Sequence, residues 1–204
     1  MKFFLGEKLH MTQVWTANGS VVPVTVLKAK PIMVTATKDM ATDGYNAVQV
    51  GFGSRNKKNV ANAVLGQTKE LGPFKYLKEF RLSSAATSSL KRGDIIGADV
   101  FAAGDKVIVS AISKGKGFQG VVKRHGFKGG PRSHGQKHNE RMPGSIGGGL
   151  RTHVPKGMRM GGRMGSERVT VRNLKVIEAN PKGELLVVSG AIPGRRGTMV
   201  EIIG

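Results

Sequence analysis

A glycine motif is the first candidate for chemistry in this chain. Gly115, Gly117 and Gly120 form the pattern G-x-G-x-x-G after a predicted strand, and Glu140 follows twenty residues later. In dinucleotide-binding folds this pattern opens a helix whose N-terminus holds the pyrophosphate. Glycines at 126, 129 and 130 and a proline at 131 exclude a helix of useful length here. We therefore expect no bound cofactor.

Histidines cluster in the same region, which holds four of the five in the chain. His134 and His138 are four residues apart, a spacing that converges on a metal ion only when a helix presents it. With no helix expected and no cysteine in the chain, we predict no metal site. The imidazoles suit hydrogen bonding or stacking on nucleotides, and solvated loop histidines are the alternative.

Nucleophilic catalysis would need a serine beside a base and a third orienting group. Three serines lie in this region, at 133, 145 and 166, and no aspartate accompanies them. Glu140 and Glu167 are each followed by an arginine, which suits a structural ion pair better than proton transfer. We predict no catalytic residues, no enzyme activity and no small-molecule substrate.

Positive charge is concentrated around these motifs. Between Lys114 and Arg172 there are fourteen Lys/Arg against two acids, a net charge of +12, together with fifteen of the thirty glycines. Such a segment has too few apolar side chains for a core of its own, and its like charges repel one another. A polyanion must neutralise it, and we favour RNA. The predicted binding residues are Lys114, Lys116, Lys123, Arg124, Lys128, Arg132, His134, Lys137, Arg141, Arg151, Lys156, Arg159, Arg163, Arg168 and Arg172.

Several other protein classes are excluded by composition. The apolar run at Phe3–Leu5 ends at Gly6, too early for a signal peptide. No segment approaches the roughly 18 apolar residues of a membrane span, and the interleaved glycines exclude an amphipathic membrane helix. The absence of cysteine excludes disulfides and is compatible with a reducing compartment. We expect a soluble intracellular protein with no membrane partner.

The elements on both sides of the basic region are predicted to be β-strands. They are short runs rich in β-branched residues, separated by turn pairs such as Asn18-Gly19 and Pro193-Gly194, which is typical of a barrel or sandwich. The predicted strands are 21–27, 32–37, 47–53, 106–112, 169–177, 185–188 and 199–203. Pro73 followed by Phe74, Leu77 and Phe80 instead predicts a helix within a small inserted unit.

Four motifs resemble one known family, the bacterial large-subunit ribosomal protein L3 (uL3) family. The resemblance extends over nearly the whole chain, with the four motifs in the order of the family. They are residues 9–13 with 23–26, the segment SKGKGFQGVVKR at 113–124, PGSIG at 143–147 and GRMGSERVT at 162–170.

This resemblance implies a mainly β fold. The expected architecture is a six-stranded Greek-key β-barrel of the translation-protein type, like the second domain of elongation factors, with a small α+β insertion and a long glycine-rich basic loop. As one ribosomal protein domain, residues 1–204 would divide into a barrel from 1–54, 91–113 and 168–204, an insertion at 55–90 and an extended loop at 114–167.

The resemblance also implies a function. Members are structural constituents of the large ribosomal subunit in the cytoplasm; they bind large-subunit rRNA, contact neighbouring ribosomal proteins, help to nucleate assembly and extend the loop toward the peptidyl transferase centre. The expected loop apex is Gly144, Ser145, Ile146, Gly147 and Gly148. The alternative, which composition alone leaves open, is a basic RNA-binding protein or RNA chaperone outside the ribosome.

Limited proteolysis tests the expectation that the basic region is the mobile part of the free protein. Because glycine costs conformational entropy when it is ordered and the region carries many trypsin sites, we expect trypsin to cut within 114–167 well before the flanking β-rich segments. Mass spectrometry of a digestion time course locates the cuts. Equal resistance of both parts would contradict the expectation.

Overall fold

The protein, described here from a computed structural model, is mainly β and divides into two units. The structure describes residues 2–16, 18–83, 89–149 and 152–204. One unit comprises residues 1–112 and 168–204, and the other comprises residues 113–167. The described part of the chain contains two α-helices, α1 (Asn62–Gln67) and α3 (Val121–His125).

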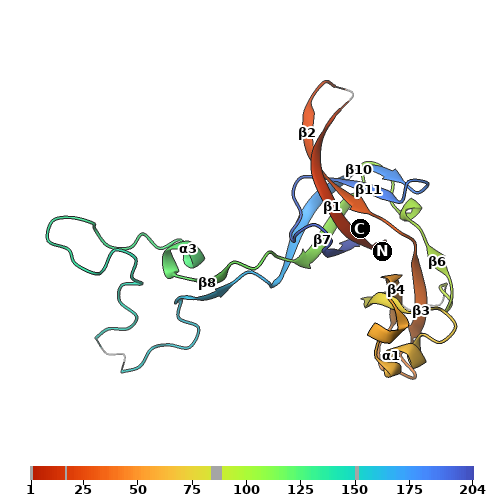
Figure 1. The fold of residues 1–204 in the computed structure, drawn as a ribbon, viewed down its shortest axis with the longest axis horizontal. Helices are drawn as coiled ribbons and strands as arrows, with labels where there is room; N and C mark the ends of the chain where they lie inside the picture. The colour runs from red at the N-terminus through yellow and green to blue at the C-terminus, as the bar shows by residue number, and fades with distance from the viewer. Residues whose placement is uncertain (1, 17, 84–88, 150–151) are drawn as a thin grey trace. The chain divides into compact units, whose positions relative to one another are not determined.

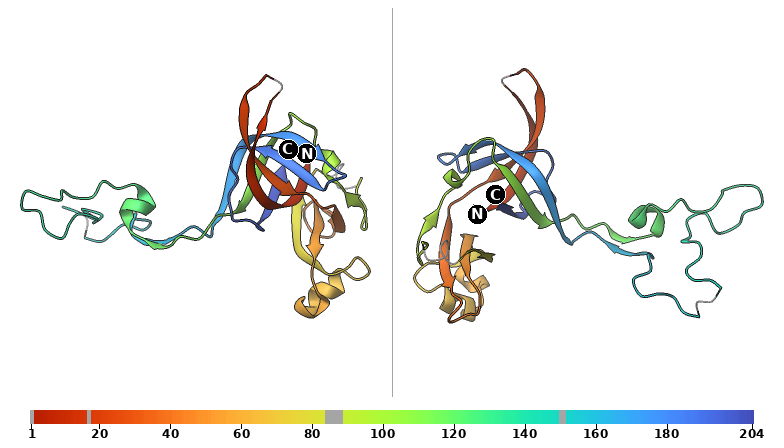
Figure 2. Two further views of the ribbon diagram at one scale, coloured as in Figure 1. Left: turned by 45° about the horizontal axis from the view of Figure 1, so that its top comes forward. Right: turned by 180° about the vertical axis from the view of Figure 1, so that it is seen from behind.

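Six antiparallel strands of the first unit pair in a closed ring in the order β1-β12-β7-β10-β11-β2 (Figure 1). The strands are β1 (Phe3–Trp15), β2 (Val21–Lys28), β7 (Lys106–Ile112), β10 (Arg168–Asn180), β11 (Leu185–Ser189) and β12 (Met199–Ile203). β1 and β2 form a long hairpin that is visible in both views of Figure 2. Because each strand has a neighbour on both sides, the ring has no unpaired edge.

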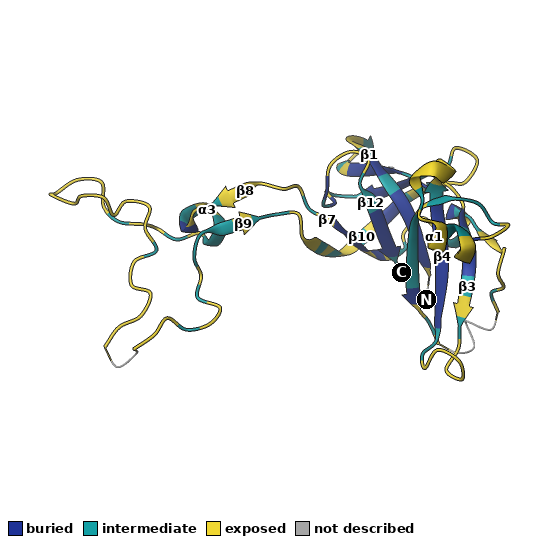
Figure 3. Ribbon diagram, turned by 60° about the horizontal axis from the view of Figure 1, so that its bottom comes forward, coloured by how far each residue is buried: buried dark blue, intermediate teal, exposed yellow. Residues whose placement is uncertain are grey.

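Apolar side chains from these strands build the core. Phe4, Leu27, Val109 and Ile202 are fully buried, one from each of β1, β2, β7 and β12. The burial colours of Figure 3 show buried stretches in dark blue on parts of β1, β12 and β7. Each such side chain stabilises the fold by roughly 1.5–3 kcal/mol, because its apolar surface is removed from water. β-Branched sequences therefore form strands here because the closed ring buries one of their faces.

A second sheet in the same unit has the strand order β5-β4-β3-β6. Its strands are β3 (Ile32–Lys38), β4 (Ala47–Ser54), β5 (Phe74–Arg81) and β6 (Ile95–Ile96), and the short helices η1 (Lys57–Asn59) and α1 lie between β4 and β5 in sequence. The Phe3 and Phe80 rings stack with centroids 4.6 Å apart, which joins this sheet to the core of the ring. A third short helix, η2 (Ala98–Val100), precedes β7.

All seven strands predicted from the sequence are confirmed, as β2, β3, β4, β7, β10, β11 and β12. The assignment of 1–54 to one barrel differs from the structure, because β3 and β4 pair with β5 and β6 and not with the ring. β4 is buried along almost its whole length, so it needs partners on both sides, which β3 and β5 provide.

The helix predicted from Pro73 to Phe80 is wrong, because Phe74–Arg81 forms strand β5. β5 pairs with β4 from Phe74 to Arg81, with Tyr76 opposite Phe52 and Phe80 opposite Val48. The aromatic residues at alternate positions, which favour a strand, outweigh the three-residue spacing that suggested a helix. Gly51 makes room for this pairing, since a Cβ there would lie 2.5 Å from the Phe74 ring.

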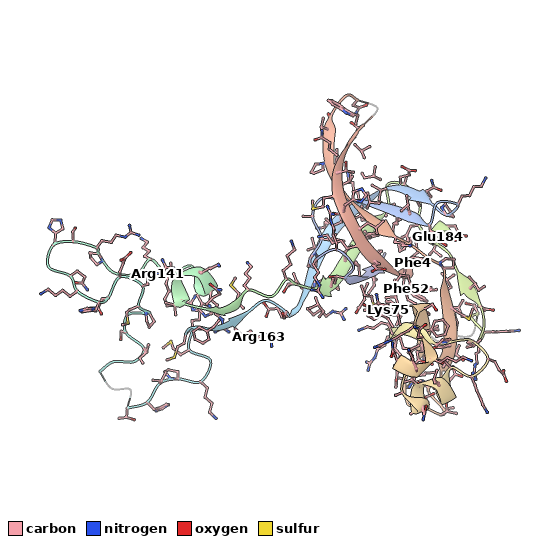
Figure 4. The ribbon with its side chains drawn as sticks, in the orientation of Figure 1. Phe4, Phe52, Lys75, Arg141, Arg163 and Glu184 are labelled. Atoms are coloured by element: carbon pink, nitrogen blue, oxygen red, sulfur yellow. The ribbon has the colours of Figure 1, made fainter. Side chains whose placement is uncertain are left out.

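Ion pairs connect the second sheet to the ring. The buried carboxylate of Glu201 on β12 accepts hydrogen bonds from both terminal nitrogens of Arg168 and lies 3.0 Å from the Nζ of Lys78 on β5. Lys75, labelled in Figure 4 with Phe4 and Phe52, lies 3.8 Å from Glu7 on β1. Two cations thus compensate the desolvation of Glu201, which would be costly for an isolated charge.

A carboxylate near the start of β7 is also paired. The Nζ of Lys2 and the backbone N–H of Ala102 donate hydrogen bonds to Asp105, and these bonds lower the pKa of its carboxyl, the Lys2 bond most. A lowered pKa in the folded state means that this contribution to stability is present above the unfolded pKa. It is lost as the pH falls through the folded pKa.

Among the described helices, none is long and apolar enough to span a bilayer.

Two isoleucines provide a matched test of the core. Ile202 is fully buried and Ile95 is 67% exposed. We expect Ile202→Ala to lower the free energy of unfolding by about 2–5 kcal/mol, because it leaves a cavity in the ring, and Ile95→Ala to change it by less than about 1 kcal/mol. Urea denaturation of both variants measures this. Similar losses would show that Ile202 does not lie in a close-packed core.

Candidate nucleic-acid interface

The second unit begins and ends in a paired stem, defined here as residues 113–120 and 160–167. The N–H of Ser113 donates to the carbonyl of Glu167 at 2.9 Å, and that of Lys116 to Met164 at 3.0 Å. Beyond these bonds, β8 (Gly117–Gln119) pairs antiparallel with β9 (Gly162–Met164). The strands predicted from the sequence all lie outside this glycine-rich region, so β8 and β9 were not predicted.

Glycine permits this pairing by letting two backbones meet. Gly165 has φ +74°, and a Cβ there would collide with the carbonyl oxygen of Lys114. A Cβ on Gly115 would lie 2.7 Å from the hydroxyl of Ser166. Strand periodicity was invisible in the sequence because backbone contacts, not alternating side chains, stabilise the stem.

Helix α3 (Val121–His125) follows the stem directly and was not predicted. It ends at Gly126, whose left-handed conformation gives the usual C-terminal cap. The Nη1 of Arg124 donates to the carbonyl of Met160 at 2.9 Å, and the Nε2 of His125 lies 3.0 Å from the same oxygen. Val121 is buried. The helix is thus fixed against the second half of the stem, residues 160–167.

This geometry decides how the G-x-G-x-x-G motif is used. A helix does begin after Gly120, but it has only five residues, in line with the expectation that no helix of useful length forms here. The preceding strand β8 pairs antiparallel with β9 and does not belong to a βαβ unit. A dinucleotide fold requires parallel strands linked by a full helix. The motif here makes a strand-to-helix corner in the stem.

Residues 128–149 form a looped segment closed by a backbone contact. The N–H of Gly130 donates to the carbonyl of Glu140 at 3.0 Å, and Arg132 Nε lies 2.7 Å from Glu140 Oε1. His134 and His138, between these contacts, have positive φ of 58° and 59° and lie on a loop, where their four-residue spacing does not converge on one point.

A cavity of about 760 Å³ is lined by Phe127, Met142, Pro143 and Ile146 together with Lys128, three glycines, Gln136 and Asn139.

Most predicted binding residues are exposed in the structure. Arg124 is only half-buried because it contacts Met160, and Arg151 lies outside the described residues. The exposed ones are Lys114, Lys116, Lys123, Lys128, Arg132, His134, Lys137, Arg141, Lys156, Arg159, Arg163, Arg168 and Arg172. Arg141 and Arg163 are labelled in Figure 4.

Besides Arg124 and Arg132, which bond to Met160 and Glu140, three more of the predicted residues have protein partners or a different location. Arg168 and Arg172 lie on β10 and belong to the first unit, where the guanidinium of Arg168 is held by Glu201. Arg159 lies over the Phe127 ring, with 5.3 Å between the guanidinium carbon and the ring centroid. The charge pattern of the sequence could not separate these structural roles from RNA binding.

Electrostatically the second unit is almost uncompensated. Within its described residues, Arg132–Glu140 is the single ion pair. The described apex residues Gly144 to Gly148 are exposed, and the hydroxyl of Ser145 donates to the carbonyl of Gly147 at 2.6 Å. A surface of exposed cations interspersed with glycines is suited to crowded phosphates.

Comparison with known proteins assigns the family. A sequence profile described as Ribosomal protein L3 matches residues 81–191. The large ribosomal subunit protein uL3 of Streptomyces coelicolor is 49% identical over 205 residues, covering 99% of this chain and 95% of that protein. The chain belongs to the ribosomal protein L3 family. The L3 proteins of Carboxydothermus hydrogenoformans (43% identical, 98% of this chain and 96% of that protein) and Nocardia farcinica (48%, 97% and 90%) are also similar.

Membership of the L3 family confirms the resemblance drawn from the four sequence motifs. The profile match spans three of them, at 113–124, 143–147 and 162–170, so the whole of the second unit is part of the family pattern. A residue that the charge pattern missed lies there as well. Phe118 on β8 is 79% exposed, and only its aromatic type could have marked it.

Gly165 tests whether the stem depends on close backbone approach. We expect Gly165→Ala to disrupt the pairing, because of its positive φ and the collision with Lys114, and to speed tryptic cleavage at Lys114 and Lys116 several-fold. The melting temperature of the first unit should not change. Gly148→Ala is the control, since its φ is not positive and a Cβ there meets only the Ser145 hydroxyl at 3.8 Å. Equal cleavage rates in both variants would contradict this role.

Proposed function

We propose that this chain is a structural constituent of the large ribosomal subunit, located in the cytoplasmic ribosome, and that it binds large-subunit rRNA without catalysing a reaction. The observation that carries the proposal is the uncompensated charge of the second unit in a member of the L3 family. Its cations would neutralise phosphates where rRNA helices crowd together, while glycine backbone passes between them.

The partners follow from the family. The relatives compared above are named as proteins of the large ribosomal subunit, so neighbouring proteins of that subunit and its rRNA are the proposed partners. We also propose that the chain helps to nucleate subunit assembly. Residues 144–148 would then lie at the end of an extended loop, 114–167, that reaches toward the peptidyl transferase centre.

For the fold, we infer that the ring is the six-stranded Greek-key barrel of the translation-protein type. The ring order β1-β12-β7-β10-β11-β2 and its antiparallel pairing support this inference. Residues 1–204 would form one ribosomal protein domain, with residues 55–90, which contain α1 and β5, as the α+β insertion. The N-terminal contribution to the barrel would be β1 and β2.

Two matched sets of lysines test the role of the second unit in rRNA binding. Lys116, Lys128, Lys137 and Lys156 are exposed in the second unit, and Lys57, Lys58, Lys69 and Lys182 are exposed in the first. Each set is replaced by glutamine, so both variants lose the same charge. We expect the substitutions in the second unit to make the slope of log affinity against log salt shallower by about 3, since each lost phosphate contact removes roughly 0.7–0.9. The substitutions in the first unit should have a smaller effect.

Binding is measured across a salt series with large-subunit rRNA and with an unrelated structured RNA. A preference for large-subunit rRNA that persists at high salt supports a ribosomal protein whose specificity comes from RNA shape. Equal affinity for both RNAs, lost together as salt rises, would favour the alternative of a non-ribosomal RNA chaperone. Equal effects of the two lysine sets would contradict a dominant role for the second unit.

A further inference from the structure

We propose that Phe118 and Arg163 form a stacking site for one unpaired nucleobase of RNA on the outer face of the stem. The inference rests on the proposed rRNA-binding function and adds to it a residue and a kind of contact that charge alone does not specify. Phe118 is 79% exposed, a higher value than those of the exposed tryptophan and methionines of the chain.

The register of the stem puts the ring and a guanidinium on one face. Phe118 on β8 is directly opposite Arg163 on β9, and residues opposite each other in an antiparallel pair project to the same side. Arg163 is also exposed. Gly161, two residues before Arg163, belongs to the same face, and a Cβ there would lie 3.4 Å from the edge of the Phe118 ring. Glycine thus leaves space beside the ring.

The opposite face of the stem is already occupied. Gly162 alternates with Arg163, and a Cβ on Gly162 would lie 2.6 Å from the guanidinium of Arg124 on α3. Arg124 in turn bonds to Met160, so α3 covers this face. The burial pattern agrees, because Gly162 and Met164 are partly buried while Arg163 between them is exposed. The stem therefore has one covered face and one open face, and the open face presents Phe118 with Arg163.

The chemistry of this face fits a nucleotide better than an apolar protein segment. Among the described residues, Phe118 has no ring or cation partner, although Phe127 has both His125 and Arg159. An aromatic ring gives a flat apolar surface for a base, and the adjacent guanidinium attracts the phosphate beside it. The exposed Lys116, two residues before Phe118, adds to the same charge. A purely apolar partner would have to bury these cations unpaired, which is unfavourable.

The base must be unpaired. In A-form RNA the major groove is deep and narrow, and a phenylalanine side chain cannot insert between stacked pairs there without opening them. Bases in loops and bulges expose their faces and commonly stack on aromatic side chains. The predicted ligand is therefore a looped or bulged nucleotide of rRNA.

Equilibrium binding of the full chain to transcribed large-subunit rRNA tests the site. We expect Phe118→Ala to weaken binding roughly 5- to 100-fold and Phe118→Leu to lose most of the same affinity, since leucine keeps apolar volume without a stacking face. Phe118→Trp should bind as tightly as the wild type. The slope of log affinity against log salt should not change in these variants, because the ring carries no charge. Arg163→Gln should make that slope shallower by about 0.7–0.9.

A fluorescent reporter observes the stack directly. Trp15 is the single tryptophan of the chain, so the double variant Trp15→Phe with Phe118→Trp places the only indole at the site. Addition of the rRNA should quench its emission and protect it from acrylamide. Exposure of position 118 makes unfolding of these variants unexpected, and their melting temperatures check this.

The outcomes separate this inference from the function on which it rests. Wild-type affinity in Phe118→Ala, or in Phe118→Leu alone, would overturn the stacking site while rRNA binding itself stands. Normal rRNA binding by Phe118→Ala combined with its exclusion from assembled subunits would also overturn it and indicate a protein contact on this face. If the wild type shows no preference for large-subunit rRNA over an unrelated RNA, the proposed function fails and the site fails with it.

Discussion

The antiparallel pairing of β7 with β10 is the interaction on which the rest of the structure depends. It places Ile112 opposite Arg168, so the two points where the chain leaves and re-enters the ring are neighbours. The whole segment 113–167 lies between these points, and its own first bond joins Ser113 to Glu167. A stem can form only because both of its strands start from adjacent positions, which lowers the entropy cost of closing so long a loop.

The two units treat charge in opposite ways. In the first, the buried Glu201 is neutralised by Arg168 and Lys78, and the buried Lys8 donates to the carbonyls of Ile192 and Gly194. Buried charges there are satisfied within the chain, as the low dielectric of a core requires. In the described part of the second unit the one ion pair is Arg132–Glu140. The first unit pairs its buried charges within the chain, whereas most cations of the second unit have no acidic partner among the described residues. This contrast points to an external polyanion.

Sequence patterns predicted the strands well because runs such as Val107 to Val109 are β-branched and alternate in burial. They failed at Phe74–Arg81, where pairing with β4 overrides a helix-like spacing, and at β8, β9 and α3, where glycine hides the periodicity. Residue type predicted which cations are exposed, but not that Arg168 bonds to Glu201 or Arg124 to Met160, since both partners are distant in sequence. Four short motifs identified the family although they say little about these contacts.

The glycines of the second unit fall into two physical groups, and the difference bears on what the partner must supply. At Gly165 and Gly129 a Cβ would collide with backbone of the facing strand or loop, so the chain itself explains why no larger residue stands there. At Gly135 and Gly144 nothing in the described structure lies within 4 Å of such an atom. Both have positive φ, so backbone conformation explains why glycine stands there. No protein atom of the described structure packs against them. In a unit with so few internal contacts, the space around them lies beside exposed cations, and a polynucleotide backbone would fill it while neutralising those cations. The stem is therefore held by contacts within the protein, whereas the looped segment 128–149 is suited to being ordered by contacts with RNA.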